Sequence, residues 1–285
     1  MNMQNKLCII TGANSGIGKA TAMKLSGLGA YIVMVCRDEE KAEKAREDII
    51  TQTGNSGVEV MLADLSYQYE IREVADRFKS KFDQLDVLIN NAGMIPSKRE
   101  ETMEGIEKTF AVNHLGPFLL TNLLLDHLKA APRARVVTVS SEVHRMGAPI
   151  FDLANLQLVD NFSPIKAYGL SKLCNIMFTR ELARQLEGTA VTANALHPGV
   201  VSTQLADEAS WSMKLFYFIG KPFMKSPGKG AETPVYLTVS DEVEEVSGKY
   251  FRNKKDVKPA EIALDENLNR KLWERSEKLA GLKSD

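Results

Sequence analysis

The chain has few cysteines and almost no net charge, and both features exclude some classes of function. Its three cysteines, Cys8, Cys36 and Cys174, stand singly, with neither a Cys-x-x-Cys pair nor a Cys/His cluster at zinc spacing. Such a set weighs against a disulfide framework and a metal site, and it is typical of a reducing compartment, so we expect a cytoplasmic protein. With 36 Lys and Arg against 37 Asp and Glu, the net charge of -1 disfavours nucleic acid as a partner.

Long apolar runs are also missing. The start of the chain is polar and leads directly into a strand-like segment, which predicts neither a signal peptide nor an amino-terminal membrane anchor. At 285 residues, 44% hydrophobic and 26% charged, the chain has the size and composition of one ordinary α/β domain. No repeat or linker divides it, so we expect a single domain over residues 1–285.

Short β-branched apolar runs alternate along the chain with longer amphipathic stretches. The runs predict strands at 7–11, 31–36, 58–63, 86–90, 134–140 and 189–195. The stretches predict helices at 16–28, 38–51, 67–82, 103–129 and 167–185. Near-continuous apolar strands separated by helix-length segments are typical of a parallel sheet covered on both faces. We therefore predict an α/β fold with a single doubly wound, Rossmann-like parallel sheet and helices on both faces.

The stretch 200–229 breaks this alternation and is rich in aromatic residues, namely Trp211, Phe216, Tyr217, Phe218 and Phe223. A long insertion after a strand is usually functional in a compact domain. We interpret the stretch as a lid over an apolar substrate, and peripheral contact with a membrane surface is the alternative.

A glycine-rich turn follows the first predicted strand, at the sheet edge where such folds bind ligands. It reads Thr11-Gly12-Ala13-Asn14-Ser15-Gly16-Ile17-Gly18. The first glycine allows a tight turn, the second lets backbone N–H groups approach a pyrophosphate, and the third permits close packing of helix on strand. We predict a dinucleotide site formed by Gly12, Asn14, Ser15, Gly16, Ile17 and Gly18; a merely structural turn is the alternative.

The end of the second predicted strand bears on the choice of dinucleotide. A carboxylate there would bind a ribose 2′-hydroxyl and repel a 2′-phosphate, but the chain has Cys36 followed by Arg37. A guanidinium suits a phosphate dianion, which favours NADP(H) over NAD(H). In the alternative interpretation, Arg37 is a solvated loop residue and Asp38 caps the next helix.

Two further strand ends carry polar groups. Asn91, Ala92 and Gly93 close the fourth strand, where buried amides need partners and a glycine admits a close approach to the backbone. Asp64 follows the third strand and could accept a hydrogen bond from an adenine amino group. A turn or helix-capping carboxylate before Ser66 is the equally weighted alternative for Asp64.

Tyr168 and Lys172 open a predicted helix at a spacing that puts the phenol and the ammonium on one face. A phenol exchanges protons with a substrate oxygen only if its pKa falls from about 10 toward working pH. A cation about 6 Å away, at an effective dielectric near 20, contributes roughly 2 to 3 kcal/mol to that shift. Two other tyrosines have a lysine at the same spacing, Tyr217 with Lys221 and Tyr250 with Lys254. Only Tyr168 begins the helix after the fifth strand.

Two polar residues lie near this pair in the predicted fold. Ser141 follows the fifth strand, where its hydroxyl could polarise a substrate carbonyl; a backbone-capping serine is the alternative. Asn113 lies four residues before Pro117, whose ring clashes with the Asn113 carbonyl in a helix. The freed carbonyl could bind a water that connects Lys172 to solvent. An ordinary proline kink with Asn113 solvated is the alternative.

The remaining motifs are weak. The histidines His114, His127, His144 and His197 share no metal-ligand spacing, so we predict surface or packing roles and no metal. The Gly-x-Ser-x-Gly elbow of many hydrolases is missing from the sequence.

Taken together and in order, these motifs resemble the short-chain dehydrogenase/reductase family over essentially the whole chain. The resemblance implies Asn113, Ser141, Tyr168 and Lys172 as a catalytic tetrad, with the tyrosine as acid/base and the lysine also holding the nicotinamide ribose. It further implies that Asp64 and Leu65 border the adenine, and that Asn91 contacts the ribose region. The nicotinamide would lie against Pro198, Gly199 and Thr203.

Within that family the sequence is most similar to the retinol dehydrogenase and WW-domain oxidoreductase branch. The likeness rests on the segments 113–116, 140–144, 171–175 and 272–274. We therefore expect an NADP(H)-dependent oxidoreductase that interconverts a carbonyl and an alcohol on a small, apolar substrate, as a homo-dimer or homo-tetramer. The expected absence of a membrane anchor weighs against a retinoid substrate. A catalytically silent dinucleotide sensor or scaffold of the same fold is the alternative.

Overall fold

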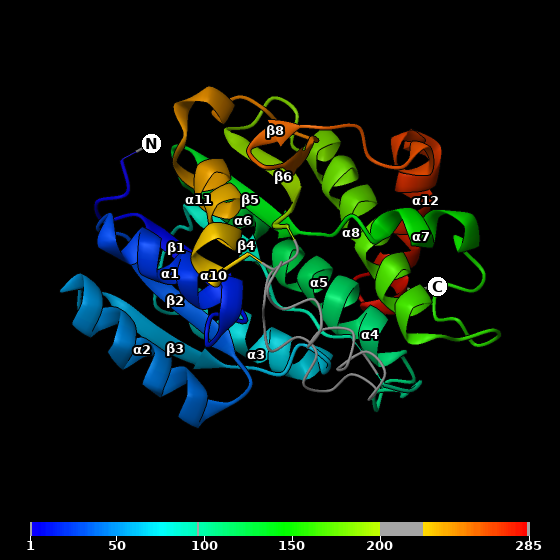
Figure 1. Cartoon of the computed structure of the whole chain (residues 1–285), viewed down its shortest axis with the longest axis horizontal. Coiled ribbons are helices and arrows are strands. Elements are labelled where there is room, and N and C mark those ends of the chain that lie inside the picture. The colour runs from blue at the N-terminus through cyan, green and yellow to red at the C-terminus, as the bar shows by residue number, and fades with distance from the viewer. Residues whose placement is uncertain (1, 96, 200–224, 284–285) are drawn as a thin grey trace.

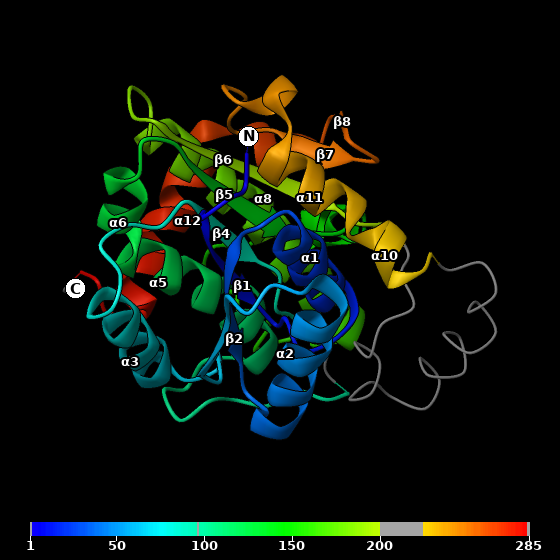
Figure 2. The same cartoon turned by 90° about the vertical axis from the view of Figure 1, so that its left-hand side faces the viewer.

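The computed structural model describes residues 2–95, 97–199 and 225–283. Its centre is an eight-stranded sheet in the order β3-β2-β1-β4-β5-β6-β7-β8 (Figures 1 and 2). The strands are β1 (Leu7–Thr11), β2 (Tyr31–Cys36), β3 (Val58–Leu62), β4 (Val87–Asn90), β5 (Ala134–Val139), β6 (Val191–His197), β7 (Tyr250–Arg252) and β8 (Lys255–Asp256). Neighbouring strands are parallel except β7 and β8, which are antiparallel. The predicted doubly wound parallel sheet is confirmed.

Helices cover both faces of this sheet. They are α1 (Gly16–Gly27), α2 (Glu39–Thr53), α3 (Gln68–Lys79), α4 (Lys108–Phe110), α5 (Gly116–Leu123), α6 (Leu125–Ala130), α7 (His144–Gly147), α8 (Pro164–Gln185), α10 (Pro227–Gly230), α11 (Glu232–Val239) and α12 (Glu266–Leu279). In Figure 2, α1, α2, α10 and α11 lie on one side of the sheet, and α3, α5, α6 and α12 lie on the other. Among the described helices, none combines the length and apolar character needed to cross a bilayer.

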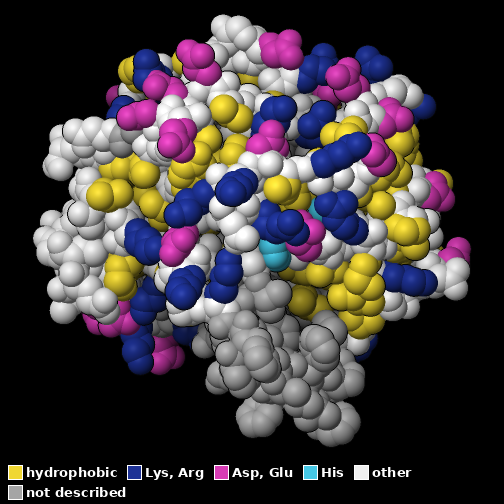
Figure 3. Space-filling model, turned by 45° about the horizontal axis from the view of Figure 1, so that its top comes forward, with side chains coloured by type: hydrophobic (Ala, Val, Ile, Leu, Met, Phe, Trp, Pro, Cys, Tyr) yellow, Lys and Arg dark blue, Asp and Glu magenta, His cyan; other side chains and the backbone are white. Residues whose placement is uncertain are grey.

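The central strands β1, β2 and β4 are almost entirely apolar because each contributes side chains to two cores. In β1, Leu7 and Ile9 belong to the core beneath α3, α5 and α8, whereas Cys8 and Ile10 belong to the core beneath α1 and α2. Successive side chains of a strand point to opposite faces, so a strand buried on both sides has no polar alternation. Most charged side chains lie at the surface, where both signs are interspersed on the face drawn in Figure 3.

The prediction of one helix over 103–129 was wrong. The helical region begins only at Lys108, after a turn in which Glu101 pairs with Glu107, and it is then interrupted by a π-helical turn, η1 (Ala111–Leu115). The amide of Gly116 donates to the carbonyl of Ala111, one residue wider than in an α-helix. Such π-helical turns are rare in proteins, and those that do occur are often found at functional sites. Most of the predicted lid, residues 200–224, and with it Thr203, lies outside the described residues.

Candidate active site

The glycine-rich turn joins β1 to α1 and has an open helix N-terminus. Gly12 and Gly16 have φ of +65° and +54°, which L side chains rarely adopt. A Cβ on Gly18 would lie 2.3 Å from the Gly12 carbonyl oxygen, so α1 packs directly on the turn. Ser15, at the N-cap, makes no side-chain capping bond to α1 among the described residues. The first N–H groups of α1 thus remain available to an anion such as a pyrophosphate.

Hydrogen bonds clamp the end of β4 to the end of β1. The Thr11 hydroxyl oxygen accepts from the backbone amides of Asn91 at 3.0 Å and Ala92 at 2.9 Å. In return, Nδ2 of Asn91 donates to the Thr11 carbonyl at 2.8 Å. Thr11 was not among the predicted site residues, although a hydroxyl in an otherwise apolar strand was the available signal. The clamp holds Gly93 at the same sheet edge as the glycine-rich turn.

At the end of β2, the carboxylate of Asp38 has a structural role at the start of α2. Asp38 accepts from the backbone amide of Lys41 at 3.0 Å and forms an ion pair with its ammonium. The bond from that amide is the main reason why the pKa of Asp38 is lowered. Asp38 therefore caps α2, as one half of the alternative interpretation predicted. Arg37, beside it, is exposed at the sheet edge where the dinucleotide is expected.

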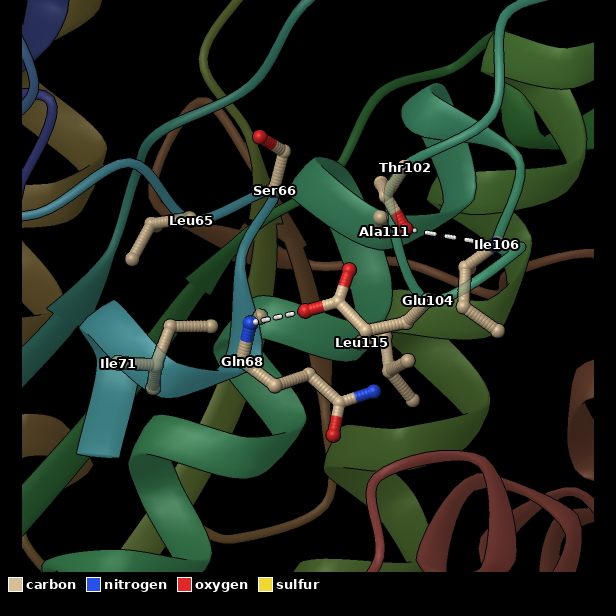
Figure 4. Close-up of a pocket in the computed structure, with 10 residues that line it drawn as sticks. Leu65, Ser66, Gln68, Ile71, Thr102, Glu104, Ile106, Ala111 and Leu115 are labelled. Atoms are coloured by element: carbon tan, nitrogen blue, oxygen red, sulfur yellow. Dashed lines mark hydrogen bonds between the residues drawn. The ribbon is translucent and has the colours of Figure 1, made fainter.

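At the end of β3, the carboxylate of Asp64 also accepts hydrogen bonds from a residue that follows it. Oδ1 of Asp64 accepts from both the amide and the hydroxyl of Ser66, at 2.8 and 2.7 Å. This is the turn geometry named as the alternative for Asp64. Leu65 and Ser66 line a pocket beside Glu104, whose carboxylate accepts from the Gln68 amide (Figure 4). Its free volume of about 10 Å³ has room for one water molecule but not for a base or a substrate.

Lys172 is buried where the ends of β4 and β5 meet α8. Its ammonium donates to the carbonyl of Val139 at 3.0 Å and lies 5.6 Å from the centre of the Tyr168 ring. Burial lowers the pKa of Lys172 to about 8. A Cβ on Gly93 would lie 3.3 Å from this ammonium and 3.3 Å from Oδ1 of Asn113. The structure thus brings Lys172, Tyr168, Asn113 and the end of β4 together.

Asn113 is fully buried in η1, so the alternative interpretation, in which Asn113 is solvated, is wrong. Its Oδ1 accepts from the Met94 amide at 2.8 Å, and its Nδ2 donates to the Met94 carbonyl and to the Ser171 hydroxyl, both at 3.0 Å. The side chain joins the segment after β4 to the turn of α8 that carries Tyr168 and Lys172. Its geometry is that of a positioning residue.

The two serines after β5 have different environments. Ser140 is buried and its hydroxyl donates to the Lys172 carbonyl at 2.7 Å, which fixes the strand end to α8. The Ser141 hydroxyl accepts from the Val143 amide at 3.3 Å. As an acceptor in that bond, Ser141 keeps its own O–H for another partner. The bond from Val143 is the backbone contact named as the alternative for Ser141, and it leaves the O–H that a substrate oxygen would need.

Pro198 and Gly199 follow β6 at the same edge of the sheet. Gly199 has φ of +96°, and a Cβ there would lie 2.9 Å from the side chain of Lys225. The ring of His197 accepts from the Glu142 amide at 3.4 Å, and burial lowers its pKa to about 4, so this histidine is neutral at pH 7. Neither Lys225 nor Glu142 was singled out from the sequence, because only the fold brings them to this edge.

Comparisons with known proteins identify the family of the chain. The model of the short chain dehydrogenase family matches residues 6–213. Human retinol dehydrogenase 14 is 43% identical, with 98% of this chain and 88% of that protein covered. An uncharacterised protein from Mycobacterium paratuberculosis has a similar structure, with a TM-score of 0.79, 33% identity, and 98% and 95% of the two chains covered. A short chain dehydrogenase from Shigella flexneri, solved with NADP, superimposes with a TM-score of 0.72 at 22% identity, over 89% and 99% of the chains. The chain therefore belongs to the short-chain dehydrogenase family and is an oxidoreductase.

Proposed function

We propose that the protein uses NADP(H) to interconvert a carbonyl and an alcohol on a small apolar molecule. The observation that carries the proposal is the position of Lys172. Its buried ammonium lies 5.6 Å from the Tyr168 ring and beside Gly93, at the sheet edge that also holds the glycine-rich turn. A phenol beside a buried cation, next to a nucleotide-binding edge, is suited to acid/base work on an oxygen atom.

The residues present suit a phosphorylated dinucleotide. The left-handed glycines Gly12 and Gly16, the uncapped start of α1 and Arg37 would hold its phosphates, and Gly93 leaves space beside Lys172. When bound, the nicotinamide supplies or accepts the hydride. Asp38 is engaged in capping α2. Arg37 is then the charged group at the end of β2 that would meet a 2′-phosphate, which supports NADP(H) over NAD(H).

In the direction of reduction, Tyr168 donates its phenolic proton to the carbonyl oxygen while the Ser141 hydroxyl donates a hydrogen bond to the same oxygen. The charged ammonium of Lys172 favours the phenolate that remains. Since burial lowers the pKa of Lys172 to about 8, its ammonium can give up a proton near that pH and so help to restore the proton that Tyr168 has lost. Asn113 fixes the segment after β4 to α8, so it maintains the spacing of these groups without touching the substrate.

The proposal also covers the location of the protein, its substrate and its oligomeric state. Cys8, Cys36 and Cys174 are buried and free, which supports a reducing, cytoplasmic location. Aromatic residues within 200–229 support an apolar substrate, and retinol dehydrogenase 14 is named for such a molecule. We propose an aldehyde or ketone of this kind, retinal included, and a homo-dimer or homo-tetramer built from one domain over residues 1–285.

The test is NADPH consumption with nonanal, benzaldehyde, cyclohexanone and all-trans-retinal. We expect turnover with at least one of them, and a loss of roughly 1000-fold in Tyr168→Phe, since general acid catalysis contributes about that much. NADPH binding, followed by nicotinamide fluorescence, should change little. Tyr69→Phe, at a half-exposed tyrosine on α3, is the matched control. Tight NADPH binding without turnover of any carbonyl would favour the sensor, and an active Tyr168→Phe would refute the assigned acid.

A further inference from the structure

The short helix α7 begins shortly after Ser141 and packs against α8, the helix that carries Tyr168 (Figure 1). At its start, Nδ1 of His144 and the backbone amide of His144 both donate to the Ser141 carbonyl, at 2.7 and 3.0 Å. The ring is fully buried. Two bonds from one residue to a single carbonyl fix the backbone of Ser141 and therefore the direction in which its hydroxyl leaves the chain.

The other ring nitrogen of His144 is fixed from a distant segment. Nε2 accepts from the backbone amide of Ala260 at 3.0 Å, so Nδ1 carries the single ring proton that bonds to Ser141. Burial lowers the pKa of His144, in keeping with a neutral ring. The ring also packs edge-on against Tyr250 at 5.0 Å, and the Tyr250 hydroxyl donates to Glu142 at 2.9 Å. The segment after Ser141 is thus held by β7 and the chain that follows it.

The far end of α7 touches α8 backbone to backbone. A Cβ on Gly147 would lie 2.5 Å from the carbonyl oxygen of Gly169 and 2.7 Å from the amide of Leu170. A Cβ on Gly169 would lie 2.9 Å from the carbonyl oxygen of Val143. Two glycines facing each other allow this approach, and Gly169 directly follows Tyr168. Close-packed backbones have little freedom to slide, so this contact fixes α7 relative to Tyr168.

We propose that α7 is a spacer that sets the distance between the Ser141 and Tyr168 hydroxyls, with His144 and Gly147 as its positioning residues. The inference rests on the proposed function, because it concerns the two groups assigned to the substrate oxygen. Neither His144 nor Gly147 is assigned a contact with substrate or cofactor. A displacement of about 1 Å between groups that act on one atom can cost about 100-fold in rate. The spacer therefore acts on turnover and not on dinucleotide binding.

Gly147→Ala tests the spacer directly, because the added Cβ must push α7 away from α8. With the panel carbonyl that is turned over fastest, we expect kcat to fall about 100-fold while the Kd for NADPH stays within about threefold. Met146→Ala is the matched control, since Met146 lies on the same helix and is 53% exposed. It should retain the wild-type kcat.

A pair of variants at His144 keeps the test open if Gly147→Ala fails to fold. His144→Gln retains a donor and an acceptor, whereas His144→Leu retains neither. We therefore expect the kcat of His144→Gln to be at least about tenfold higher than that of His144→Leu. The spacer is overturned if Gly147→Ala keeps the wild-type kcat, if the two His144 variants are equally active, or if NADPH binding weakens as much as kcat falls. Those outcomes are separate from a failure of the proposed function, which an active Tyr168→Phe would reveal.

Discussion

The two halves of the sheet edge are built by different means. On the dinucleotide side, the groups expected to face the ligand are backbone groups of one short stretch of chain, the turn after β1, and Thr11 ties that turn to the end of β4 across 80 residues. On the catalytic side, side chains from distant segments meet: Asn113 bonds to Ser171, 58 residues away, and His144 bonds to Ala260, 116 residues away. A local site tolerates changes elsewhere in the fold, whereas a site assembled from distant parts depends on every contact that aligns them.

Asn113→Ala should expose this dependence most strongly. It removes three hydrogen bonds and leaves the backbone N–H and C=O of Met94 without their Asn113 partner, while the Ser171 hydroxyl still donates to the Tyr168 carbonyl. We expect unfolding free energy to fall by about 3 kcal/mol and kcat to fall roughly 100-fold, with the Kd for NADPH nearly unchanged. Urea denaturation and steady-state kinetics measure both effects. Asn122→Ala, which removes one bond within α5, is the control, and equal kinetics for the two variants would contradict the assigned role of Asn113.

Lys172, on the catalytic side, should make the unfolding free energy depend on pH. Burial lowers its pKa from 10.5 to about 8 in the folded protein, while the unfolded chain keeps the ordinary value. Between these values the unfolded state binds more protons, so stability rises with pH; below about pH 8 both states are charged and the burial cost is fully present. Relative to Lys172→Met, the wild type should gain about 2 to 3 kcal/mol from about pH 7.5 to pH 10. Urea unfolding at both pH values measures this gain, with Lys129→Met as an exposed control. Parallel profiles for wild type and Lys172→Met would refute it.

The sequence was sufficient where a structural demand is local. The bounds of β1 and β2 agree with the predicted strands, because residues buried on both faces leave an unbroken apolar run. The tight turn at Gly12 was predictable because a left-handed backbone conformation selects glycine at that position. The four-residue spacing likewise placed Tyr168 and Lys172 on one helix face before any fold was known.

The sequence was insufficient where partners meet only in the folded chain. Pro117 predicted a freed Asn113 carbonyl within one helix over 103–129, but neither the proline nor the hydrophobic periodicity indicates that the interruption is a π-helical turn. The bonds from Asn113 to Met94 and from His144 to Ala260 depend on packing between elements, which spacing alone does not encode. The lid over 200–229 stays a prediction, since residues 200–224 are outside the described part of the chain.

Gly18→Ala should affect the dinucleotide half alone. The added Cβ would meet the Gly12 carbonyl oxygen at 2.3 Å and force α1 away from the turn. Overpacking of this kind costs about 2 kcal/mol, so we expect the Kd for NADPH to rise roughly 30-fold. Gly27→Ala on the same helix, with its nearest neighbour at 3.8 Å, should bind NADPH as the wild type does. Fluorescence titration distinguishes the two variants, and similar affinities would show that this packing does not shape the site.

Arg37→Ala is expected to have the smallest effect, and this effect should be confined to the binding of NADP(H). NADP(H) and NAD(H) differ only in the 2′-phosphate, so the ratio of their dissociation constants isolates whatever binds that group. Loss of a charge-assisted bond at an exposed site is worth about 1.5 kcal/mol, so the Kd for NADPH should rise roughly tenfold while that for NADH stays constant. The effect should shrink at high salt, since Arg37 is exposed. Lys44→Ala, at an exposed lysine of α2, controls for a general loss of positive charge. An equal change for both dinucleotides would mean that Arg37 is a solvated loop residue and that this half of the site selects its ligand through the backbone alone.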